Sequence, residues 1–314
     1  MTTSTVSRSA GGTRSASFWR IRSSDDDRLV QGFLFLFPAM AILLLFLAYP
    51  LFKGVWLSLT DASIGDAGVF VGLENYIWLW DDSVFWIAVF NTMAYTAVAS
   101  AGKFAIGLYL ALLLNRRIAV QKLIRSLILI PFVVPTVLSA MAFWWILDSQ
   151  FSIISWSLRN LGLIDSNIDF LGDPTLARVS VTVANIWRGI PFVAITLLAG
   201  LQTVSPSLYE AAAIDGATGW QIFRRVTLPM LTPIIAVVMT FTVLMTFTDF
   251  QLIWSMTRGG PVNSTHLMAT LSYQRGILSG NIGEGAAIAT AMIPFLLLAI
   301  FVSWYGLQNR KWQN

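Results

Sequence analysis

Residues 210–233 read EAAAIDGATGWQIFRRVTLPMLTP, a polar stretch with frequent Ala and Gly that lies between two long apolar runs. The chain around it is 314 residues long, 56% hydrophobic and only 11% charged. Soluble domains are usually about 25% charged, so too few charged side chains remain here to cover a soluble surface. The composition therefore predicts a polytopic membrane protein that keeps this polar stretch at one face of the membrane.

The residues in and before this stretch predict a helix–turn–helix over 205–233. Pro206 is typical of a helix start, because proline is tolerated at the first helical position. Gly216 indicates a tight turn, since glycine adopts positive φ without strain. Pro229 and Pro233 are expected to end the second helix before the next membrane span, because proline lacks a backbone N–H.

Six stretches are long and apolar enough to cross a bilayer as helices, which takes about 20 residues. They are 29–51, 84–114, 127–147, 179–201, 234–254 and 286–307. Thirteen Lys and Arg fall in the N-terminal tail and on the same side of the membrane, and four fall on the other side. Because positive charges favour cytoplasmic loops, both termini are expected to be cytoplasmic. We expect an all-α, six-helix transmembrane domain over residues 29–314.

The composition excludes several classes of chemistry. There is no cysteine, which rules out disulfides and thiol catalysis, and the single histidine, His266, cannot build a histidine-based metal site alone. The basic residues form no cluster interleaved with aromatics, so the net charge of +4 does not indicate nucleic-acid binding. Residues 1–28 are rich in Ser, Thr and Arg and lack an apolar core, which predicts a disordered cytoplasmic tail rather than a signal peptide.

The polar stretch resembles the EAA loop of permease subunits in binding-protein-dependent ABC importers. The matching positions, in order, are Glu210-Ala211-Ala212, Asp215-Gly216-Ala217, Phe223 and Leu228-Pro229. Phe70-Val71-Gly72-Leu73-Glu74-Asn75-Tyr76 resembles the first-permease signature of the carbohydrate-uptake branch, which includes the larger maltose-importer and glycerol-phosphate-importer permeases. The resemblance runs from about Leu29 to the end, and it implies a type I ABC importer permease fold in the bacterial cytoplasmic (inner) membrane.

In this family the exposed turn is the coupling helix, which docks in a groove of an ATPase subunit. The resemblance implies that Glu210 pairs with a basic residue of the ATPase and that Asp215 and Gly216 form the turn. Ala211, Ala212 and Ala217 would allow close approach.

The resemblance also implies the partners of the chain. They are a second permease subunit, expected to be a different chain, two ATPase subunits and an extracytoplasmic sugar-binding protein, with membrane lipid around them. No GxxxxGK[ST] phosphate-binding loop occurs in the sequence. We therefore expect no enzyme activity and no cofactor on this chain, and ATP and Mg would be bound by the partner ATPase subunits.

The resemblance to the maltose importer also implies where a sugar would pass. The pair of prolines at 131 and 135 places Phe132 and Thr136 in the third span. Counting from the EAA loop without gaps gives two further groups of residues: Asn185, Arg188, Gly189 and Phe192 in the fourth span, and Thr242, Thr246 and Asp249 in the fifth. The last three are spaced i, i+4 and i+7 and share one helix face. Polar groups beside an aromatic ring suit a sugar, which presents hydroxyls and a C–H surface.

Three charged residues in the spans, Lys103, Arg188 and Asp249, need an explanation, because ionisable groups at membrane depth are costly. Arg188 stands where the maltose permease has a neutral residue. It either pairs with Asp249, which we favour because buried charges are usually paired, or meets an anionic substrate such as a phosphorylated, sulfonated or uronic sugar. Lys103 is expected to be structural, with its ammonium snorkelling towards the cytoplasmic end of its span.

Two other classes of function are compatible with a polytopic chain. A stand-alone, ion-coupled secondary transporter would predict inverted repeats and broken helices with ion sites, and no repeat relates the two halves of this sequence. A membrane enzyme would need clustered histidines or acidic residues at one face, and the sequence has no such cluster. The permease interpretation is therefore favoured.

Overall fold

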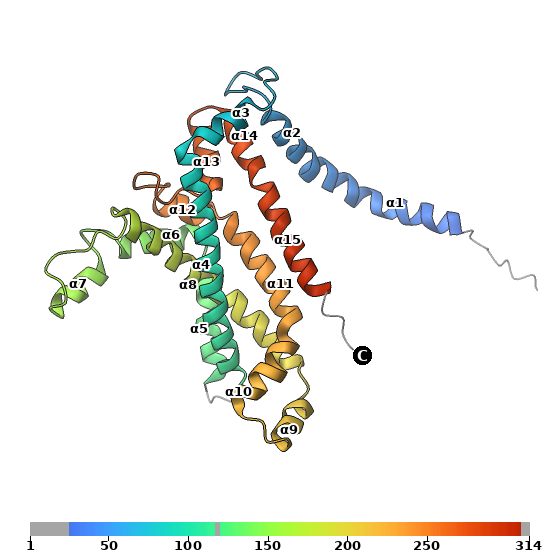
Figure 1. The fold of residues 1–314 in the computed structure, drawn as a ribbon, viewed down its shortest axis with the longest axis vertical. Helices are drawn as coiled ribbons and strands as arrows, with labels where there is room; N and C mark the ends of the chain where they lie inside the picture. The colour runs from blue at the N-terminus through green and yellow to red at the C-terminus, as the bar shows by residue number, and fades with distance from the viewer. Residues whose placement is uncertain (1–24, 117–119, 309–314) are drawn as a thin grey trace, which may run out of the picture. The chain divides into compact units, whose positions relative to one another are not determined.

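The computed structural model describes residues 25–116 and 120–308, which are mostly helical (Figure 1). The helices of the first half are α1 (Asp25–Leu43), α2 (Tyr49–Leu57), α3 (Glu74–Asp81), α4 (Ser83–Leu114), α5 (Gln121–Val133), α6 (Thr136–Ile146) and α7 (Ile153–Asn160). Those of the second half are α8 (Pro174–Thr203), α9 (Pro206–Ile214), α10 (Gly219–Ile222), α11 (Leu228–Phe247), α12 (Gln251–Met256), α13 (Met268–Tyr273), α14 (Ile282–Ala291) and α15 (Ile293–Gln308). Three π-helical turns join neighbouring helices: η1 (Leu44–Ala48), η2 (Phe223–Thr227) and η3 (Gln274–Leu278). In the described ranges, β-structure is limited to two isolated bridges.

The chain divides into two compact units, residues 1–52 and 53–314. Five helical stretches are long and apolar enough to cross a membrane: Gln31–Leu57, Ser83–Leu114, Pro174–Thr203, Gly219–Phe247 and Ile282–Val302. A sixth span results if the bent pair α5 and α6 is counted as one. The all-α, multi-span architecture expected from the sequence is confirmed.

The third predicted span is not one continuous helix. The axes of α5 and α6 differ by 93°, and the break falls between Val133 and Thr136. Val134 has extended backbone, with φ −67° and ψ 129°. Pro135 explains this, because proline disfavours the helical conformation of the residue before it and cannot donate a backbone hydrogen bond.

The expected end of the second helix of the 205–233 segment at Pro229 and Pro233 is also wrong. The helix continues from Gly219 to Phe247 through the π-helical turn η2. Arg225, whose carbonyl a helical Pro229 would approach, lies in this wider turn, which relieves the clash. Pro233 lies inside α11, and such prolines are tolerated where surrounding groups satisfy the freed backbone.

Helices α4 and α8 make the most extensive contact between any two described elements. Seven buried residues of α4, spaced three or four apart, form a stripe of mainly small side chains along the helix: Ala88, Thr92, Tyr95, Ala99, Lys103, Gly107 and Ala111. Small residues let membrane helices approach closely, because no hydrophobic driving force acts between helices in lipid. Lys103 is the only charged residue of α4, and it lies in the middle of this stripe.

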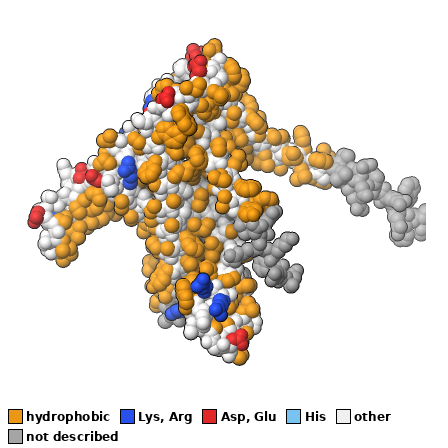
Figure 2. All heavy atoms as spheres, in the orientation of Figure 1, with side chains coloured by type: hydrophobic (Ala, Val, Ile, Leu, Met, Phe, Trp, Pro, Cys, Tyr) orange, Lys and Arg blue, Asp and Glu red, His pale blue; other side chains and the backbone are white. Residues whose placement is uncertain are grey.

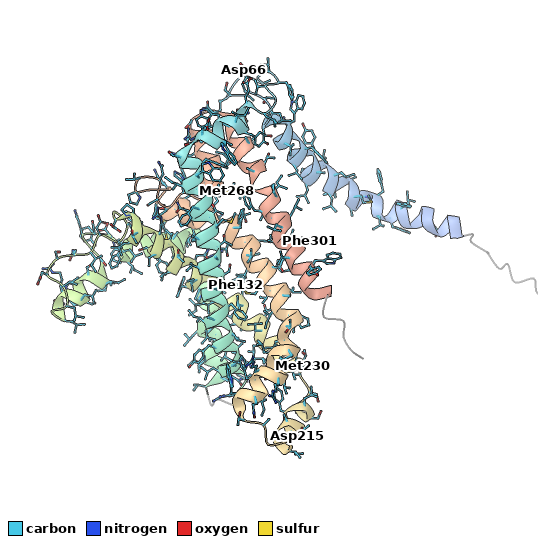
Figure 3. All side chains as sticks on the ribbon, in the orientation of Figure 1. Asp66, Phe132, Asp215, Met230, Met268 and Phe301 are labelled. Atoms are coloured by element: carbon cyan, nitrogen blue, oxygen red, sulfur yellow. The ribbon has the colours of Figure 1, made fainter. Side chains whose placement is uncertain are left out.

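A charged cluster joins several elements at the end of residues 53–314 that carries Asp66, opposite the end that carries Asp215 (Figure 3). The guanidinium of Arg275 in η3 lies 3.1 Å from Asp82 Oδ2 and 3.4 Å from Glu284 Oε1, and 5.1 Å from the centre of the Trp78 ring. These contacts tie η3 to the start of α4, to α14 and to α3.

The histidine near this cluster is uncharged at neutral pH. His266 is 2% exposed and lies within hydrogen-bond distance of Thr270, 3.1 Å from its hydroxyl. Burial, together with the positive charge of Arg275, lowers the pKa of His266 to about 4. The imidazole is therefore a neutral packing group of the segment before α13.

We expect Arg275→Met to lower the free energy of unfolding by about 1–3 kcal/mol, because it leaves two partly buried carboxylates without a cationic partner. The measurement is thermal unfolding of the purified protein in detergent. Arg258→Met is the matched control, because Arg258 is exposed and forms neither of the two ion pairs found in the described residues. Equal melting of the two variants would contradict the role given to the cluster.

Candidate functional site

The helix–turn–helix expected over 205–233 is present. Helix α9 starts at Pro206 after Ser205, and Gly216 takes a left-handed conformation, with φ +76°, in the turn that follows. Thr218 then caps α10 in a reciprocal box, in which its backbone N–H donates to Gln221 Oε1 at 2.7 Å. The sequence predicted the start of α9 and the turn at Gly216 well because these signals are local.

The six candidate coupling residues lie on the surface of this loop. Glu210, Ala211, Asp215 and Gly216 are exposed, and Ala212 and Ala217 are half-buried. Figure 2 shows basic side chains gathered at the same end of the molecule, and Figure 3 labels Asp215 there.

Two apolar residues that the sequence analysis did not single out are also exposed in this loop. The exposed fractions are 86% for Ile214 and 66% for Trp220. Large apolar side chains displayed on an otherwise polar loop are typical of a protein interaction site. Their position inside a polar stretch is the sequence signal that could have identified them.

Eight of the nine candidate pathway residues surround one cavity of about 80 Å³. The lining residues are Lys103, Phe132, Asn185, Arg188, Gly189, Phe192, Thr242, Met245, Thr246 and Asp249. Thr136, the ninth candidate, does not line it, because it begins α6 beyond the sharp bend at Pro135. The rings of Phe132 and Phe192 are stacked, with centroids 6.3 Å apart.

Asp249 lies at the break between α11 and α12 and is held by neutral donors. Its Oδ2 accepts hydrogen bonds from the Tyr95 hydroxyl at 2.7 Å and from Asn185 Nδ2 at 2.8 Å, and its Oδ1 accepts from the Leu252 N–H at 3.3 Å. The expected ion pair with Arg188 is wrong: both ion pairs in the described residues belong to Arg275, and Arg188 Nε is buried without a partner. Three neutral hydrogen-bond donors satisfy the Asp249 carboxylate in place of a positively charged partner.

The expectation that Lys103 snorkels to the membrane surface is also wrong. Lys103 is only 5% exposed, and its Nζ donates a hydrogen bond to Thr246 Oγ1 at 2.8 Å in the wall of the cavity. A lone lysine in an otherwise uncharged apolar helix was a sequence signal for such a position. Tyr95, which the sequence analysis did not single out, joins the same polar network through Asp249.

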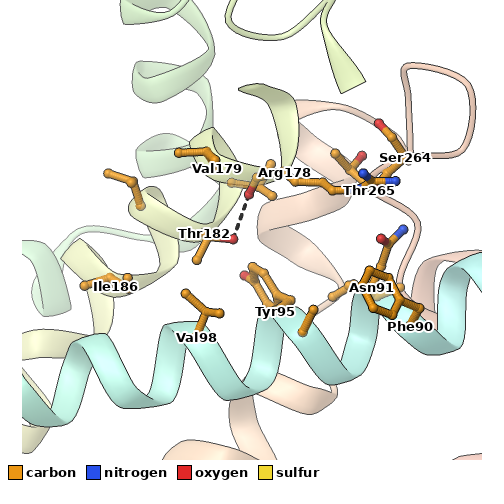
Figure 4. A pocket seen from close by; sticks show the side chains of 14 residues that line it. Phe90, Asn91, Tyr95, Val98, Arg178, Val179, Thr182, Ile186, Ser264 and Thr265 are labelled. Carbon is orange, nitrogen blue, oxygen red and sulfur yellow. Dashed lines mark hydrogen bonds between the residues drawn. The ribbon is translucent and has the colours of Figure 1, made fainter. Parts of the chain in front are cut away.

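A second, mostly apolar cavity of about 310 Å³ lies beside this network between α4 and α8 (Figure 4). Phe90 and Val98 on α4 and Val179 and Ile186 on α8 contribute to its walls. Tyr95 lines this cavity as well, while its hydroxyl reaches Asp249, so its side chain separates the apolar space from the polar one.

A multi-span helical chain with a capped, exposed loop and a polar cavity among its helices has the architecture of a membrane permease. Residues 103–314 match the family described as "Binding-protein-dependent transport system inner membrane component". The chain belongs to this family of transport permeases and is a multi-pass membrane protein.

Curated relatives cover most of the chain. The trehalose/maltose transport system permease protein MalF of Thermococcus litoralis is 33% identical over 87% of this chain and 92% of its own length. The sulfoquinovosyl glycerol transport system permease protein SmoG of Agrobacterium fabrum is 34% identical over 85% of this chain and 86% of its own length. A chain of a bacterial ABC transporter involved in the import of the acidic polysaccharide alginate superposes with a TM-score of 0.76, covering 92% of this chain and 98% of that one. At 23% identity, that superposition shows the shared ABC importer permease fold.

We expect Tyr95→Phe to lower the free energy of unfolding by about 1 kcal/mol, because it removes a donor from the Asp249 carboxylate. The loss should shrink when Tyr95→Phe is made in an Asp249→Asn background, since the two residues act as a pair. Thermal unfolding of the four proteins in detergent completes this cycle.

Tyr109→Phe is the control for the loss of a hydroxyl, because Tyr109 is 65% exposed. Independent effects of the Tyr95 and Asp249 substitutions would contradict the pairing.

Proposed function

We propose that this chain is the first-type permease subunit of an ATP-driven importer for a sugar or sugar derivative. The observation that carries the proposal is the exposed EAA-type loop on a chain of the binding-protein-dependent permease family. The relatives named above belong to transport systems for trehalose/maltose and for sulfoquinovosyl glycerol. The proposed substrate class, a sugar or sugar derivative, therefore includes both a neutral and a sulfonated example. We take the substrate class from them and the coupling mechanism from the loop.

The loop of α9 and α10 is the proposed contact with an ATPase subunit. Its exposed carboxylate, Glu210, and its exposed Ile214 offer one charged and one apolar contact on either side of the small alanines. ATP binding would close two partner ATPases, and the loop would transmit that closure to the helices as a rigid lever, because α10 continues without interruption into α11. ATP and Mg would be bound by those partners and not by this chain, which we propose is no enzyme.

The polar cavity is the proposed wall of the sugar pathway. Its volume of about 80 Å³ is below the roughly 300–1,000 Å³ of typical ligand pockets, so this chain would supply only half of the passage. A second permease subunit, in our proposal a different chain, would supply the other half. An extracytoplasmic sugar-binding protein would deliver the sugar to both.

The placement in the bacterial inner membrane follows from the same proposal. The loop that meets the ATPases must be cytoplasmic, and the excess of Lys and Arg in the tail and on the loop's side favours that orientation. Both termini would then be cytoplasmic. A stand-alone ion-coupled transporter remains the competing function, and it would need neither the loop nor the partners.

The decisive experiment is purification of the chain in mild detergent from its native host. We expect two ATPase subunits and a second permease to co-purify. Reconstituted in nanodiscs with the binding protein, the complex should hydrolyse ATP faster when a sugar is present. Uptake driven by a proton or sodium gradient without any ATPase would instead establish the competing function.

We expect Gly216→Val to reduce sugar-stimulated ATP hydrolysis by about tenfold, because a β-branched residue strains a left-handed turn and displaces the docking loop. The matched control is Gly162→Val. Gly162 also has positive φ, at +68°, and open space around it, but it lies between α7 and α8, away from the loop. An equal loss of ATP hydrolysis in both variants would count against the coupling role.

A further inference from the structure

We infer that Lys103 and Arg188 form a cationic pair in the polar cavity that binds an acidic group of the transported sugar. The inference rests on the proposed sugar pathway and adds to it a substrate class, anionic glycosides, and a binding residue, Lys103.

The first step concerns how Lys103 reaches the cavity. A Cβ placed on residue 189 would lie 2.5 Å from Lys103 Cε and 3.1 Å from Nζ. The lysine side chain therefore runs over bare backbone of α8 at Gly189, and Thr246 receives its ammonium on the far side at 2.8 Å. Gly189 lines the cavity, and its role in this inference is to leave room for Lys103 instead of contacting the sugar itself.

The second step concerns charge. Lys103, Arg188 and Asp249 all line the cavity, which gives it two positive charges and one negative charge. Asp249 is engaged by Tyr95 and Asn185, and neither cation takes part in the ion pairs found in the described residues. An ammonium has three donors, and the hydrogen bond to Thr246 uses one of them.

The third step concerns the ligand. Cationic groups at membrane depth are costly without an anionic partner, and both side chains here present unused N–H donors: the buried Lys103 on its ammonium, and the half-buried Arg188 at its buried Nε. A carboxylate, sulfonate or phosphate supplies anionic acceptors that suit an ammonium and a guanidinium together. A neutral glycoside leaves the surplus charge of the cavity uncompensated. The stacked Phe132 and Phe192 rings would then face the apolar side of the same sugar.

The test uses the whole importer complex in proteoliposomes, with its binding protein and pairs of glycosides that differ only in one acidic group. Methyl glucuronide with methyl glucoside is one such pair, and a 6-sulfonated glucoside with glucoside is another. We expect wild type to transport the acidic member of a pair about tenfold faster. Equal or faster transport of the neutral member overturns the inference.

Substitutions in the permease distinguish its own contribution to sugar selectivity from that of the binding protein, because the binding protein is identical in every assay. Lys103→Met and Arg188→Gln are each expected to slow uptake of the acidic sugar by about tenfold, because each removes a charge-assisted hydrogen bond. Lys103→Arg should restore most of the rate. Unchanged uptake of the acidic sugar by Arg188→Gln overturns the pair. If Lys103→Met does not assemble, Arg188→Gln and Lys103→Arg still decide the outcome.

The positioning role of Gly189 has its own readout. Gly189→Ala should slow acidic-sugar uptake in the wild-type background and add nothing in the Lys103→Met background, because its effect passes through the lysine. Equal slowing in both backgrounds means that Gly189 acts only through packing, and it overturns the placement of Lys103. Should no sugar be transported although the ATPases co-purify, the proposed substrate class fails. If neutral sugars are transported as well as acidic ones, only the anionic inference fails.

Discussion

The close packing of α4 against α8 is the constraint on which the polar cavity depends. Small residues along α4 allow the two helices to approach, and the single charged residue of that stripe, Lys103, passes over Gly189 instead of pushing the helices apart. Because the Lys103 side chain is held between two packed helices, its ammonium lies beside Thr246 and donates a hydrogen bond to it. Packing therefore decides where a charge lies in this protein.

Interruptions of the helices provide the rest of the site. Asp249 can accept three hydrogen bonds because it lies between α11 and α12, where the chain leaves helical geometry and a side chain on α4 and another on α8 can both reach it. The bend at Pro135 turns α6 away, so Phe132 stays at the cavity and Thr136 leaves it. Irregular backbone at membrane depth is tolerated where it is buried in protein or lines a cavity. The break before Pro135 and the break at Asp249 both lie next to the polar cavity.

The sequence predicted local features best. The start of α9 and the turn at Gly216 follow from neighbouring residues, so they could be predicted without knowledge of the fold. Eight of the nine pathway candidates, which the family resemblance supplied, also meet at one cavity. The spacing of Thr242, Thr246 and Asp249 on one helix face is consistent with that. Two expectations failed at prolines, in opposite directions. The span expected over 127–147 breaks before Pro135, whereas the helix expected to end at Pro229 continues through it. A proline's effect depends on whether a wider turn can absorb it, and that is a property of the surrounding chain.

The sequence by itself determined that the chain is a helical membrane protein with an exposed polar loop, because apolar length, charge distribution and turn residues act over a few neighbouring positions. Only the tertiary structure decided which charges meet. Arg188 and Asp249 looked like natural partners on adjacent spans, yet Tyr95 and Asn185 hold the carboxylate, and Lys103 lies inside the bundle. The physical reason is that a hydrogen-bond or ion-pair partner is selected by distances of about 3 Å between helices, and these distances are set by packing that no single segment encodes.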